Sequence, residues 1–339
     1  MARDLAIDLG TSNLRVVRAR EGIVLDQPTV VAIDASDGTV VATGEPSWQH
    51  IGGPTGSIVA SHPIRHGVIV DFDTVQRMVA AVLRGLGLRR FQRARVVACV
   101  AAEASDVERR AIEEAVTGAG AHAVTLVEEP LAAAVGAGLP ISDPIGTLLV
   151  DIGGGKTQAA IVALGGVVSV RSSRIGGCDL DEAIRAHVVE TYGVEIGEAA
   201  AERLKIEFGS ALPVTEGRTA AVLGRELASG AEREVRLSEH EIRAALSVPV
   251  ARIADCVRRV LADAPPELTN DVLEAGMFLT GGGSLLRGLD LRLAQEAEVP
   301  VHLTDRPLES AVLGAGAMLE RLEDYGVGFQ FVRRRSLRG

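Results

Sequence analysis

The sequence predicts a two-lobed α/β protein in which one core design is used twice. The chain has 339 residues, whereas a single hydrophobic core rarely grows beyond ~250–300 residues. Residues 5–17 and 148–162 share a pattern in which an apolar strand leads to Asp, an apolar residue and Gly, and a short turn precedes another apolar strand. Strand patterns alternate with helical patterns in both halves of the chain, as in α/β proteins. Because the repeated segments are short, a chance resemblance of two hairpins is the alternative.

The composition excludes several classes of protein. The formal net charge of -10 argues against general affinity for nucleic acids, which requires a basic surface. Cys99, Cys178 and Cys256 lie far apart without a CxxC pair, which argues against a disulfide framework and a structural zinc site. Charge or glycine interrupts every apolar stretch before the ~20 residues that span a bilayer, and the N-terminus lacks the pattern of a secretory signal. We therefore expect a cytoplasmic protein, unless it is tethered peripherally to a membrane.

Capping patterns predict the starts of three helices. In each pattern a capping residue precedes Glu by three positions and opens a run with apolar periodicity. The three patterns begin at Ser105, Asp179 and Ser238. The first helix should end near residues 118–120 and the second near Gly193. Pro249 should break or kink the third.

Two carboxylates and two glycine turns predict a phosphate site. Asp8 and Asp151 each end an apolar strand immediately before a turn that contains glycine. Glycine lets backbone N–H groups approach an anion closely, and paired carboxylates can hold a hydrated Mg²⁺ against phosphates. In the first turn Thr11, Ser12 and Asn13 can donate hydrogen bonds to phosphate oxygens. The alternative is two ordinary hairpins with Asp in the turn.

A third glycine cluster, Gly281 to Ser284, follows an apolar strand and precedes a helical pattern over residues 285–294. A glycine turn at a helix start can meet a phosphate or a flat base, although a structural turn is the more frequent role. Gly155-Lys156-Thr157 looks like the end of a P-loop. The first glycine of that motif would fall at Val150, so the P-loop interpretation fails.

These motifs resemble a known superfamily. DLGTSN from Asp8, VDIGGGKT from Val150 and LTGGGSLLRG from Leu279 resemble the two phosphate motifs and the adenosine motif shared by actin, sugar kinases and DnaK-type chaperones. Three longer stretches are similar to the MreB/Mbl family of bacterial actin homologues. They are HPIRHGVIVDFD from His62, VEEPLAAAVGAGLP from Val127 and YGVEIGEAAAERLKIEFGSA from Tyr192. The similarity is collinear from about residue 5 to about residue 325.

The resemblance implies an actin-like (ribonuclease H-like) fold with a duplicated core and a central nucleotide cleft. Lobe I would cover residues 1–143, with subdomain IB at approximately 33–62. Lobe II would cover residues 144–330, with subdomain IIB at approximately 178–245. A basic tail would follow over residues 331–339. The cleft would hold ATP, or GTP, with Mg²⁺ held through water by Asp8 and Asp151.

The resemblance also implies roles for individual residues. The residues expected to contact phosphates are Gly10, Thr11, Ser12, Asn13, Gly153, Gly154, Gly155 and Lys156. The segment from Glu202 through Arg203 and Leu204 to Lys205 should reach the ribose and base, and Gly281, Gly282, Gly283 and Ser284 should line the adenosine. Glu129 matches the residue that orients the attacking water, with Asp151 and Lys156 as further catalytic candidates. A carboxylate placed at a helix start by the helix dipole is the alternative for Glu129.

The phosphate motif departs from the family pattern. The usual GGGTTE is GGGKTQ here, so Lys156 replaces a threonine associated with hydrolysis and Gln158 replaces a glutamate. Ser12 replaces the more usual alanine. We hypothesise that nucleotide binding survives and that hydrolysis is weakened.

Family resemblance predicts a cytoskeletal protein that determines cell shape. It would polymerise into filaments on the inner face of the cytoplasmic membrane and work with cell-wall morphogenesis proteins. Leu88 and Phe91, among several arginines, would form a peripheral membrane loop, and residues 329–335 have a similar character. An exposed basic turn and a frayed tail are the alternatives. A chaperone-type ATPase is the second candidate function, although the chain leaves no room for a peptide-binding domain, and a small-molecule kinase is the third.

Overall fold

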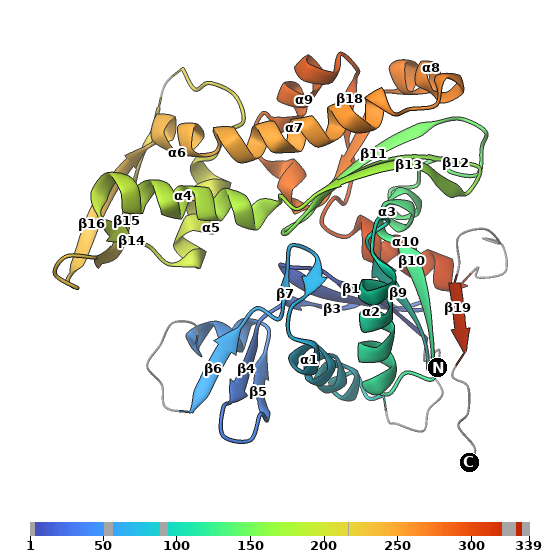
Figure 1. Cartoon of the computed structure of the whole chain (residues 1–339), viewed down its shortest axis with the longest axis horizontal. Coiled ribbons are helices and arrows are strands. Elements are labelled where there is room, and N and C mark those ends of the chain that lie inside the picture. The colour runs from blue at the N-terminus through green and yellow to red at the C-terminus, as the bar shows by residue number, and fades with distance from the viewer. Residues whose placement is uncertain (1–3, 51–56, 89–93, 216, 321–329, 334–339) are drawn as a thin grey trace. The chain divides into compact units, whose positions relative to one another are not determined.

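The structure is a computed structural model of the whole chain (Figure 1). It describes residues 4–50, 57–88, 94–215, 217–320 and 330–333. The chain forms two compact units. Unit 1 comprises Met1–Ile145, Ile161–Val170 and Leu308–Gly339, and unit 2 comprises Gly146–Ala160 and Arg171–Pro307.

Unit 1 is built on a six-stranded mixed sheet with the order β19-β10-β9-β1-β2-β3. β1 pairs antiparallel with β2, which pairs antiparallel with β3, whereas β1 and β9, and β9 and β10, are parallel. The strands are β1 (Leu5–Leu9), β2 (Asn13–Arg18), β3 (Gly22–Pro28), β9 (Arg95–Val100), β10 (Ala123–Glu128) and β19 (Gln330–Arg333).

The two faces of this sheet bury different helices. Val16 on one face joins the core formed with α1 (Phe72–Gly85) and α2 (Asp106–Gly118), which lie side by side in Figure 1. Its neighbour Val17 lies against Gly316 of α10 (Ser310–Glu320) on the other face, because successive strand residues point to opposite sides. The sheet is therefore covered on both faces, as its apolar strands predict.

α10 crosses α3 (Glu129–Gly136) at very short range (Figure 1). A Cβ at Gly314 would lie 1.7 Å from the backbone oxygen of Ala132, and a Cβ at Gly136 would lie 1.9 Å from that of Ser310. Glycine is required at both positions because the two backbones touch. This packing groups α10 with unit 1, whereas the sequence analysis assigned residues through 330 to lobe II.

Smaller elements complete unit 1. A three-stranded sheet has the order β5-β4-β6, and a short hairpin pairs β7 with β8. The hairpin turns at His66 and Gly67, which both have positive φ, 47° and 73°. The elements are β4 (Val31–Asp34), β5 (Val40–Thr43), η1 (Glu45–His50), β6 (Ile58–Ser61), β7 (Ile64–Arg65) and β8 (Val68–Ile69).

Unit 2 repeats the central design of unit 1. The five-stranded sheet on which it is centred has the order β13-β12-β11-β17-β18, and β11 pairs parallel with β17 and β17 with β18. The parts of β12 and β13 within Ile161–Val170 are grouped with unit 1. The strand order corresponds strand by strand to β3-β2-β1-β9-β10 of unit 1. The shared order supports the duplication that the two Asp–Gly segments predict. The strands are β11 (Thr147–Ile152), β12 (Thr157–Ala163), β13 (Gly166–Ser173), β17 (Met277–Thr280) and β18 (Val301–Leu303).

Unit 2 also carries a three-stranded ribbon with the order β14-β15-β16. Its strands are β14 (Val194–Glu195), β15 (Thr219–Glu226) and β16 (Glu232–Ser238). The helices are α4 (Gly177–Tyr192), α5 (Glu198–Phe208), α6 (Glu239–Ala245), α7 (Ser247–Ala262), α8 (Pro266–Ala275), the short η2 (Gly282–Leu285) and α9 (Leu289–Ala297).

Two of the three capping predictions are confirmed. Ser105 and Ser238 form capping boxes that open α2 and α6. The third prediction is wrong by three residues. The N-cap of α4 is Gly176 instead of Asp179, which lies inside the first turn of the helix. There its Oδ2 accepts the N–H of Gly176 at 2.8 Å, so the carboxylate satisfies a helix-end donor from the N3 position.

Helix ends follow the predicted breakers. Gly193 caps α4 in the left-handed conformation. The predicted break before Pro249 is confirmed, since α6 ends at Ala245 and α7 starts at Ser247. Pro249 thus lies in the first turn of α7, where its missing N–H removes no helical hydrogen bond.

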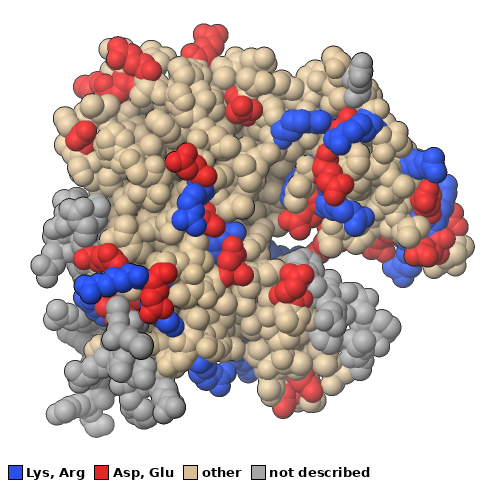
Figure 2. All heavy atoms as spheres, turned by 180° about the vertical axis from the view of Figure 1, so that it is seen from behind, with Lys and Arg blue, Asp and Glu red and all other residues tan. Residues whose placement is uncertain are grey.

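The surface mixes charges of both signs. On the face drawn in Figure 2, blue basic and red acidic side chains are interspersed over the described residues. Ion pairs among the described residues include Arg225–Glu195 and Arg233–Glu226. In the part of the chain that the structure describes, no helix combines the length and apolarity needed to cross a membrane.

Candidate functional site

The first glycine turn connects β1 to β2 in unit 1. The N–H of Gly10 donates to the backbone oxygen of Asn13 at 3.1 Å and closes the turn. A Cβ at Gly10 would lie 2.7 Å from that oxygen, so this position admits only glycine. Asp8 lies on β1 opposite Arg15, two residues before the turn.

Side chains brace this first turn. Thr29, which is fully buried, donates its N–H to the backbone oxygen of Ser12 at 2.8 Å and its hydroxyl to that of Gly10 at 2.7 Å. The hydroxyl of Thr11 accepts the N–H of Gly67 at 2.8 Å, which leaves its own proton to donate to a ligand. The amide of Asn13 donates to Asp26 at 2.7 Å. The side-chain amide of Asn13 therefore already has a protein acceptor.

The second glycine turn connects β11 to β12 in unit 2, and it closes in the same way. The N–H of Gly153 donates to the backbone oxygen of Lys156 at 2.9 Å. Asp151 precedes Gly153 by two residues, as Asp8 precedes Gly10. The two turns superimpose in sequence as Gly10 on Gly153 and Asn13 on Lys156, so Lys156 occupies the closing position. A strand–turn–strand arrangement is also incompatible with a P-loop, which the sequence analysis had rejected.

The N-terminus of α4 is docked on this second turn. Gly177 donates its N–H to the backbone oxygen of Gly153 at 2.9 Å, and Cys178 donates to that of Gly154 at 2.8 Å. A Cβ at Gly176 would lie 2.5 Å from both of those oxygens. The Gly176-Gly177 pair therefore allows the helix start to approach the turn, a role that the sequence analysis did not assign.

The third glycine cluster lies beside Asp151. β17 pairs with β11 so that Thr280 is opposite Asp151, and a Cβ at Gly281 would lie 2.4 Å from Asp151 Oδ1. Gly281 has a φ of 78° and donates its N–H to the backbone oxygen of Pro307 at 2.8 Å. The structure thus brings together two motifs that are 130 residues apart in sequence.

Ser284 is buried within this cluster. Its side chain is only 4% exposed, and its hydroxyl donates to the backbone oxygen of Gly281 at 2.6 Å. Ser284 therefore stabilises the loop from inside, and its contact with the adenosine stays a prediction.

The buried carboxylate of Glu239 binds Arg287, which lies three residues after this cluster. Glu239 at the start of α6 accepts hydrogen bonds from the guanidinium groups of Arg218 at 2.7 Å and Arg287 at 3.1 Å. Hydrogen bonds from the backbone and side chain of Arg218 lower the pKa of Glu239 to about 2. Arg287 also accepts the N–H of Ala211 at its backbone oxygen. These contacts fix the loop between η2 and α9.

The α5 segment divides into exposed and buried residues. Glu202 and Arg203 are exposed, whereas Leu204 is 2% exposed and belongs to the core. The Leu204 side chain packs in the core, and the predicted contact of this position with a ligand is not tested by that burial. Helical spacing explains the burial, because Ala201 and Leu204 lie on the buried stripe of α5.

Lys205 is held at the α4 N-terminus. Its Nζ donates to Asp181 Oδ2 at 2.8 Å and to the backbone oxygen of Gly177 at 3.2 Å. Burial raises the pKa of Asp181 to about 6, although the Lys205 ammonium opposes that shift. The other oxygen, Asp181 Oδ1, is buried without a hydrogen-bond partner in the described residues. Asp181 was not predicted as a site residue, because its pairing with a lysine 24 residues away has no local signal in the sequence.

Glu129 is the first residue of α3, directly after β10, and its side chain is 8% exposed. This position agrees with the helix-dipole explanation and also with a buried acid that faces a ligand. Its neighbour Glu128 pairs with Arg109 at 3.2 Å. Gln158 is fully buried in β12, so a glutamate there would require a buried charge.

The membrane prediction falls partly outside the described residues. Phe91 and most of the loop, residues 89–93, lie there, as do residues 334–339 of the basic tail. Leu88 is described, and it is partly buried against the core of unit 1. Its side chain is therefore partly exposed, and its insertion into a membrane stays a prediction.

A metal centre made only of protein ligands is absent from the described residues, which contain no group of three or more His, Cys, Asp or Glu that could hold a metal ion. Asp8 belongs to unit 1 and Asp151 to unit 2. Each is a single carboxylate at the end of a strand, which suits a Mg²⁺ ion that keeps several waters and takes its remaining ligands from phosphates.

The duplicated sheet, with a glycine turn after the first strand of each copy, defines an actin-like α/β protein. Comparison with known proteins gives the same fold class, and it also identifies a particular family within that class. The chain matches the MreB/Mbl protein family over residues 2–326, and it belongs to that family.

Curated relatives cover nearly the whole chain. The cell shape-determining protein MreB of Escherichia coli (strain K12) is 45% identical over 331 residues, which is 96% of this chain and 95% of that protein. The cell shape-determining protein Mbl of Bacillus subtilis (strain 168) is 38% identical over 323 residues, with 95% and 97% covered.

Solved structures agree with the fold. The crystal structure of MreB5 of Spiroplasma citri bound to ADP is similar with a TM-score of 0.88 and 29% identity, covering 94% of this chain and 97% of that one. The same protein bound to AMPPNP also gives 0.88. The MamK double helical filament gives 0.77 at 21% identity over 94% and 99% of the two chains, which supports the fold alone. The predicted actin-like fold is confirmed.

Proposed function

We propose that this chain binds ATP with Mg²⁺ and polymerises into actin-like filaments that determine cell shape at the inner face of the cytoplasmic membrane. The observation that carries the proposal is the pair of glycine turns. Both turns are closed by the same backbone hydrogen bond, and an aspartate precedes the first glycine of each by two residues. Family membership supports the cell-shape function, since the relatives named MreB and Mbl are cell shape-determining proteins.

The nucleotide roles follow from the contacts in each unit. We assign phosphate binding to the two turns and water-mediated Mg²⁺ binding to Asp8 and Asp151. The glycine backbone at 281–283 and the exposed start of the Glu202–Lys205 segment would face the nucleoside. ADP and AMPPNP in the similar MreB5 structures support an adenine nucleotide. When bound, Mg²⁺ would neutralise phosphate charge, and Glu129 would orient the attacking water.

Lys156 is the residue that makes hydrolysis slow in this proposal. It stands at the closing position of the second turn, and its ammonium is a compact point charge suited to pairing with a terminal phosphate. Such pairing favours the bound nucleotide as much as the transition state, and uniform binding does not raise turnover. The protein would then be a weak ATPase.

We extend the proposal to the subdomains. The β5-β4-β6 sheet would form subdomain IB, and the elements from α4 to α6 would form subdomain IIB. A ligand that contacts both lobes can bias one subunit geometry. In this way the nucleotide would govern assembly of the homopolymer, whose further partners would be cell-wall morphogenesis proteins.

The test is negative-stain electron microscopy of the purified chain on an anionic lipid monolayer, with Mg-ATP and without nucleotide. We expect filaments that require ATP. Asp151→Asn should abolish them, whereas Asp263→Asn, an exposed aspartate of the same unit that pairs with Arg171 at 2.6 Å, should not. Particles that stay monomeric although ATP binds would contradict the filament function and favour a non-polymerising ATPase. Phosphorylation of a sugar by the purified chain would favour a kinase.

A further inference from the structure

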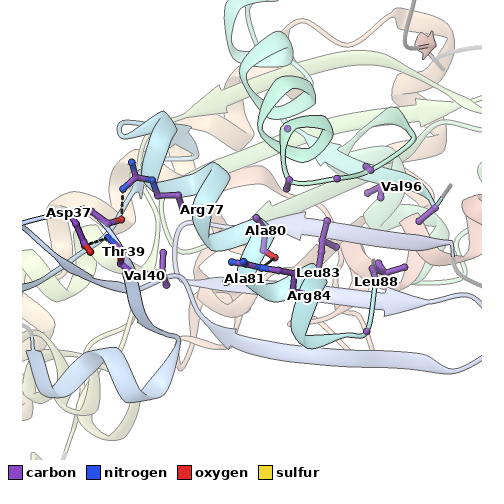
Figure 3. A pocket seen from close by; sticks show the side chains of 17 residues that line it. Asp37, Thr39, Val40, Arg77, Ala80, Ala81, Leu83, Arg84, Leu88 and Val96 are labelled. Carbon is purple, nitrogen blue, oxygen red and sulfur yellow. Dashed lines mark hydrogen bonds between the residues drawn. The ribbon is translucent and has the colours of Figure 1, made fainter. Parts of the chain in front are cut away.

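Unit 1 contains a cavity of about 1010 Å³ that the proposed function does not use (Figure 3). It lies between α1, the turn before β5, the start of β9 and the C-terminal end of α2. Its lining residues all belong to unit 1, and none of them is a proposed nucleotide contact. The volume is at the upper end of the range for small-molecule sites, ~300–1,000 Å³.

One face of α1 forms a wall of this cavity. Arg77 and Arg84 lie seven residues apart, with Ala80 and Ala81 between them. Positions i, i+3, i+4 and i+7 share a helix face, and seven residues rise about 10 Å along the axis. The opposite face of α1 is buried in the core. The arrangement is therefore two cationic side chains on either side of a shallow alanine floor.

Both guanidinium groups lack an acidic partner. Arg77 donates to the backbone oxygen of Gly38, and Arg84 donates through Nε to that of Ala80 at 3.1 Å (Figure 3). Neither forms an ion pair with any described carboxylate. Asp37 lines the cavity too, but its Oδ1 accepts the N–H of Thr39 at 2.8 Å. Two positive charges against one thus leave the cavity wall cationic.

Apart from Thr39, the remaining lining residues are apolar or glycine. Val40, Ala80, Ala81 and Leu88 are partly exposed and form its accessible apolar surface, whereas Leu83 and Val96 are buried in the core. At this end the cavity also meets Gly118 to Ala121, where α2 ends without a basic residue in its last turn. The C-terminus of a helix carries partial negative charge. An anion is therefore favoured near Arg77 and Arg84 and disfavoured near the end of α2.

We propose that this cavity binds an anionic amphiphile. A phosphate or carboxylate head group would pair with Arg77 and Arg84, and the hydrocarbon part would lie against the partly exposed Val40, Ala81 and Leu88. The guanidinium fork fits such head groups through charge-assisted hydrogen bonds. The same head-group chemistry could come from a phospholipid or from free phosphate, and the hydrocarbon part separates these two sources.

The test uses the full chain without nucleotide, so that its result does not depend on polymerisation or on the proposed ATP site. Calorimetric titrations compare three probes: dihexanoyl phosphatidylglycerol below its critical micelle concentration, dihexanoyl phosphatidylcholine and inorganic phosphate. We expect the anionic lipid to bind at least about tenfold more tightly than either other probe. Arg77→Gln/Arg84→Gln should weaken it at least about tenfold, as expected for the loss of charge-assisted contacts.

Two further variants make the test specific. Arg110→Gln, an exposed arginine of α2 that pairs with Glu114 at 3.6 Å and does not line the cavity, should bind like the unchanged chain. Ala81→Trp places a bulky ring on the floor between the two arginines and keeps both of them, and it should weaken lipid binding while thermal unfolding confirms that the chain is folded. If it does not fold, the exposed arginine pair still decides. Equal binding of phosphate and lipid, unchanged binding by the double variant, or an equal loss with Arg110→Gln would overturn the proposal.

Discussion

The two glycine turns share a backbone closure but are held in place by different means. In unit 1 the hydroxyl and N–H of Thr29 donate to two backbone oxygens of the turn. In unit 2 the corresponding partners are backbone N–H groups of Gly177 and Cys178, at the start of α4. A side chain reaches the first turn from a loop, whereas a helix end is placed directly on the second.

This difference decides which residues each turn can tolerate. The N–H of Thr29 approaches the first turn as closely as the helix start approaches the second, but the Cβ of Thr29 is accommodated and carries a hydroxyl that also donates to the turn. At the second turn a Cβ on Gly176 would meet two backbone oxygens, so this position can carry none. The duplicated design therefore specifies the turn itself, and each copy has its own means of support.

The largest expected effect comes from a methyl group at Gly176. Its φ of -154° is accessible to alanine, so the cost of Gly176→Ala is steric. The new Cβ would lie 2.5 Å from two backbone oxygens, and α4 would have to move away from the turn. We expect a loss of about 3 kcal/mol or more in the free energy of unfolding, because overpacking of this kind costs ~1–3 kcal/mol and turn hydrogen bonds are lost as well. Urea unfolding measures it.

Gly197→Ala is the matched control. Gly197 caps α5 with an extended backbone, and no atom lies within 4 Å of a Cβ built there. It should change stability by about 0.5 kcal/mol or less. If both variants lost the same stability, the close approach of α4 would not be the cause.

The next effect concerns the carboxylate of Asp181 in α4, the helix that contacts the second turn. The contacts described for the first turn include no such buried carboxylate. Burial raises the pKa of Asp181 from 3.8 to about 6. An acid whose pKa is raised by folding stabilises the native state below its unfolded pKa, and that stability is lost as pH rises through the folded pKa. The contribution of Asp181 should therefore fall between about pH 4 and pH 6 and stay constant above about pH 7.

Asp181→Asn isolates this contribution. Relative to the variant, the unchanged chain should lose on the order of 2 kcal/mol of unfolding free energy across that window. Denaturant unfolding at pH steps from 4.5 to 8 measures the difference. Parallel curves for the two proteins would mean that the ammonium of Lys205 compensates the buried charge fully.

A smaller effect is expected in the first turn. Thr29→Val keeps the shape of the buried side chain and removes the hydroxyl that donates to Gly10. The loss should be about 1 to 2 kcal/mol, the cost of an unmade hydrogen bond at a buried oxygen. Thr29→Ser should restore most of it. If serine failed as badly as valine, packing of the methyl group would be the main role of Thr29.

The features predicted from sequence are those with a local pattern. The apolar strand, aspartate and glycine turn occur twice within short segments, and this repeat predicted the duplicated core. Ser105 and Ser238 correctly predicted the starts of their helices, because a capping box is a pattern of only four residues. The position of Asp179 was misjudged for a local reason too, since a carboxylate at N3 and one at the N-cap look alike in sequence.

The features that were missed depend on contacts between distant segments. Thr29, Gly67 and Gly176 touch the glycine turns only after the chain folds, and nothing in their neighbourhoods indicates a partner. The Asp181–Lys205 pair joins two helices. Leu204 and Ser284 were assigned to a ligand by motif, and the burial of their side chains was not predicted.

The smallest expected effect tests the closing residues of the two turns directly. Lys156 occupies the position that Asn13 has in the first turn, and we hypothesise that its charge holds nucleotide at the expense of turnover. Lys156→Thr should raise the rate of phosphate release about three- to tenfold, or ~1 kcal/mol in the activation free energy, and should weaken ATP binding slightly. Lys156→Arg, which keeps the charge, is the control and should remain slow. A phosphate-release assay that gives the unchanged chain and Lys156→Thr the same turnover would refute the hypothesis. In that case the two turns would differ only in the residues that hold them in place, Thr29 for the first and the start of α4 for the second.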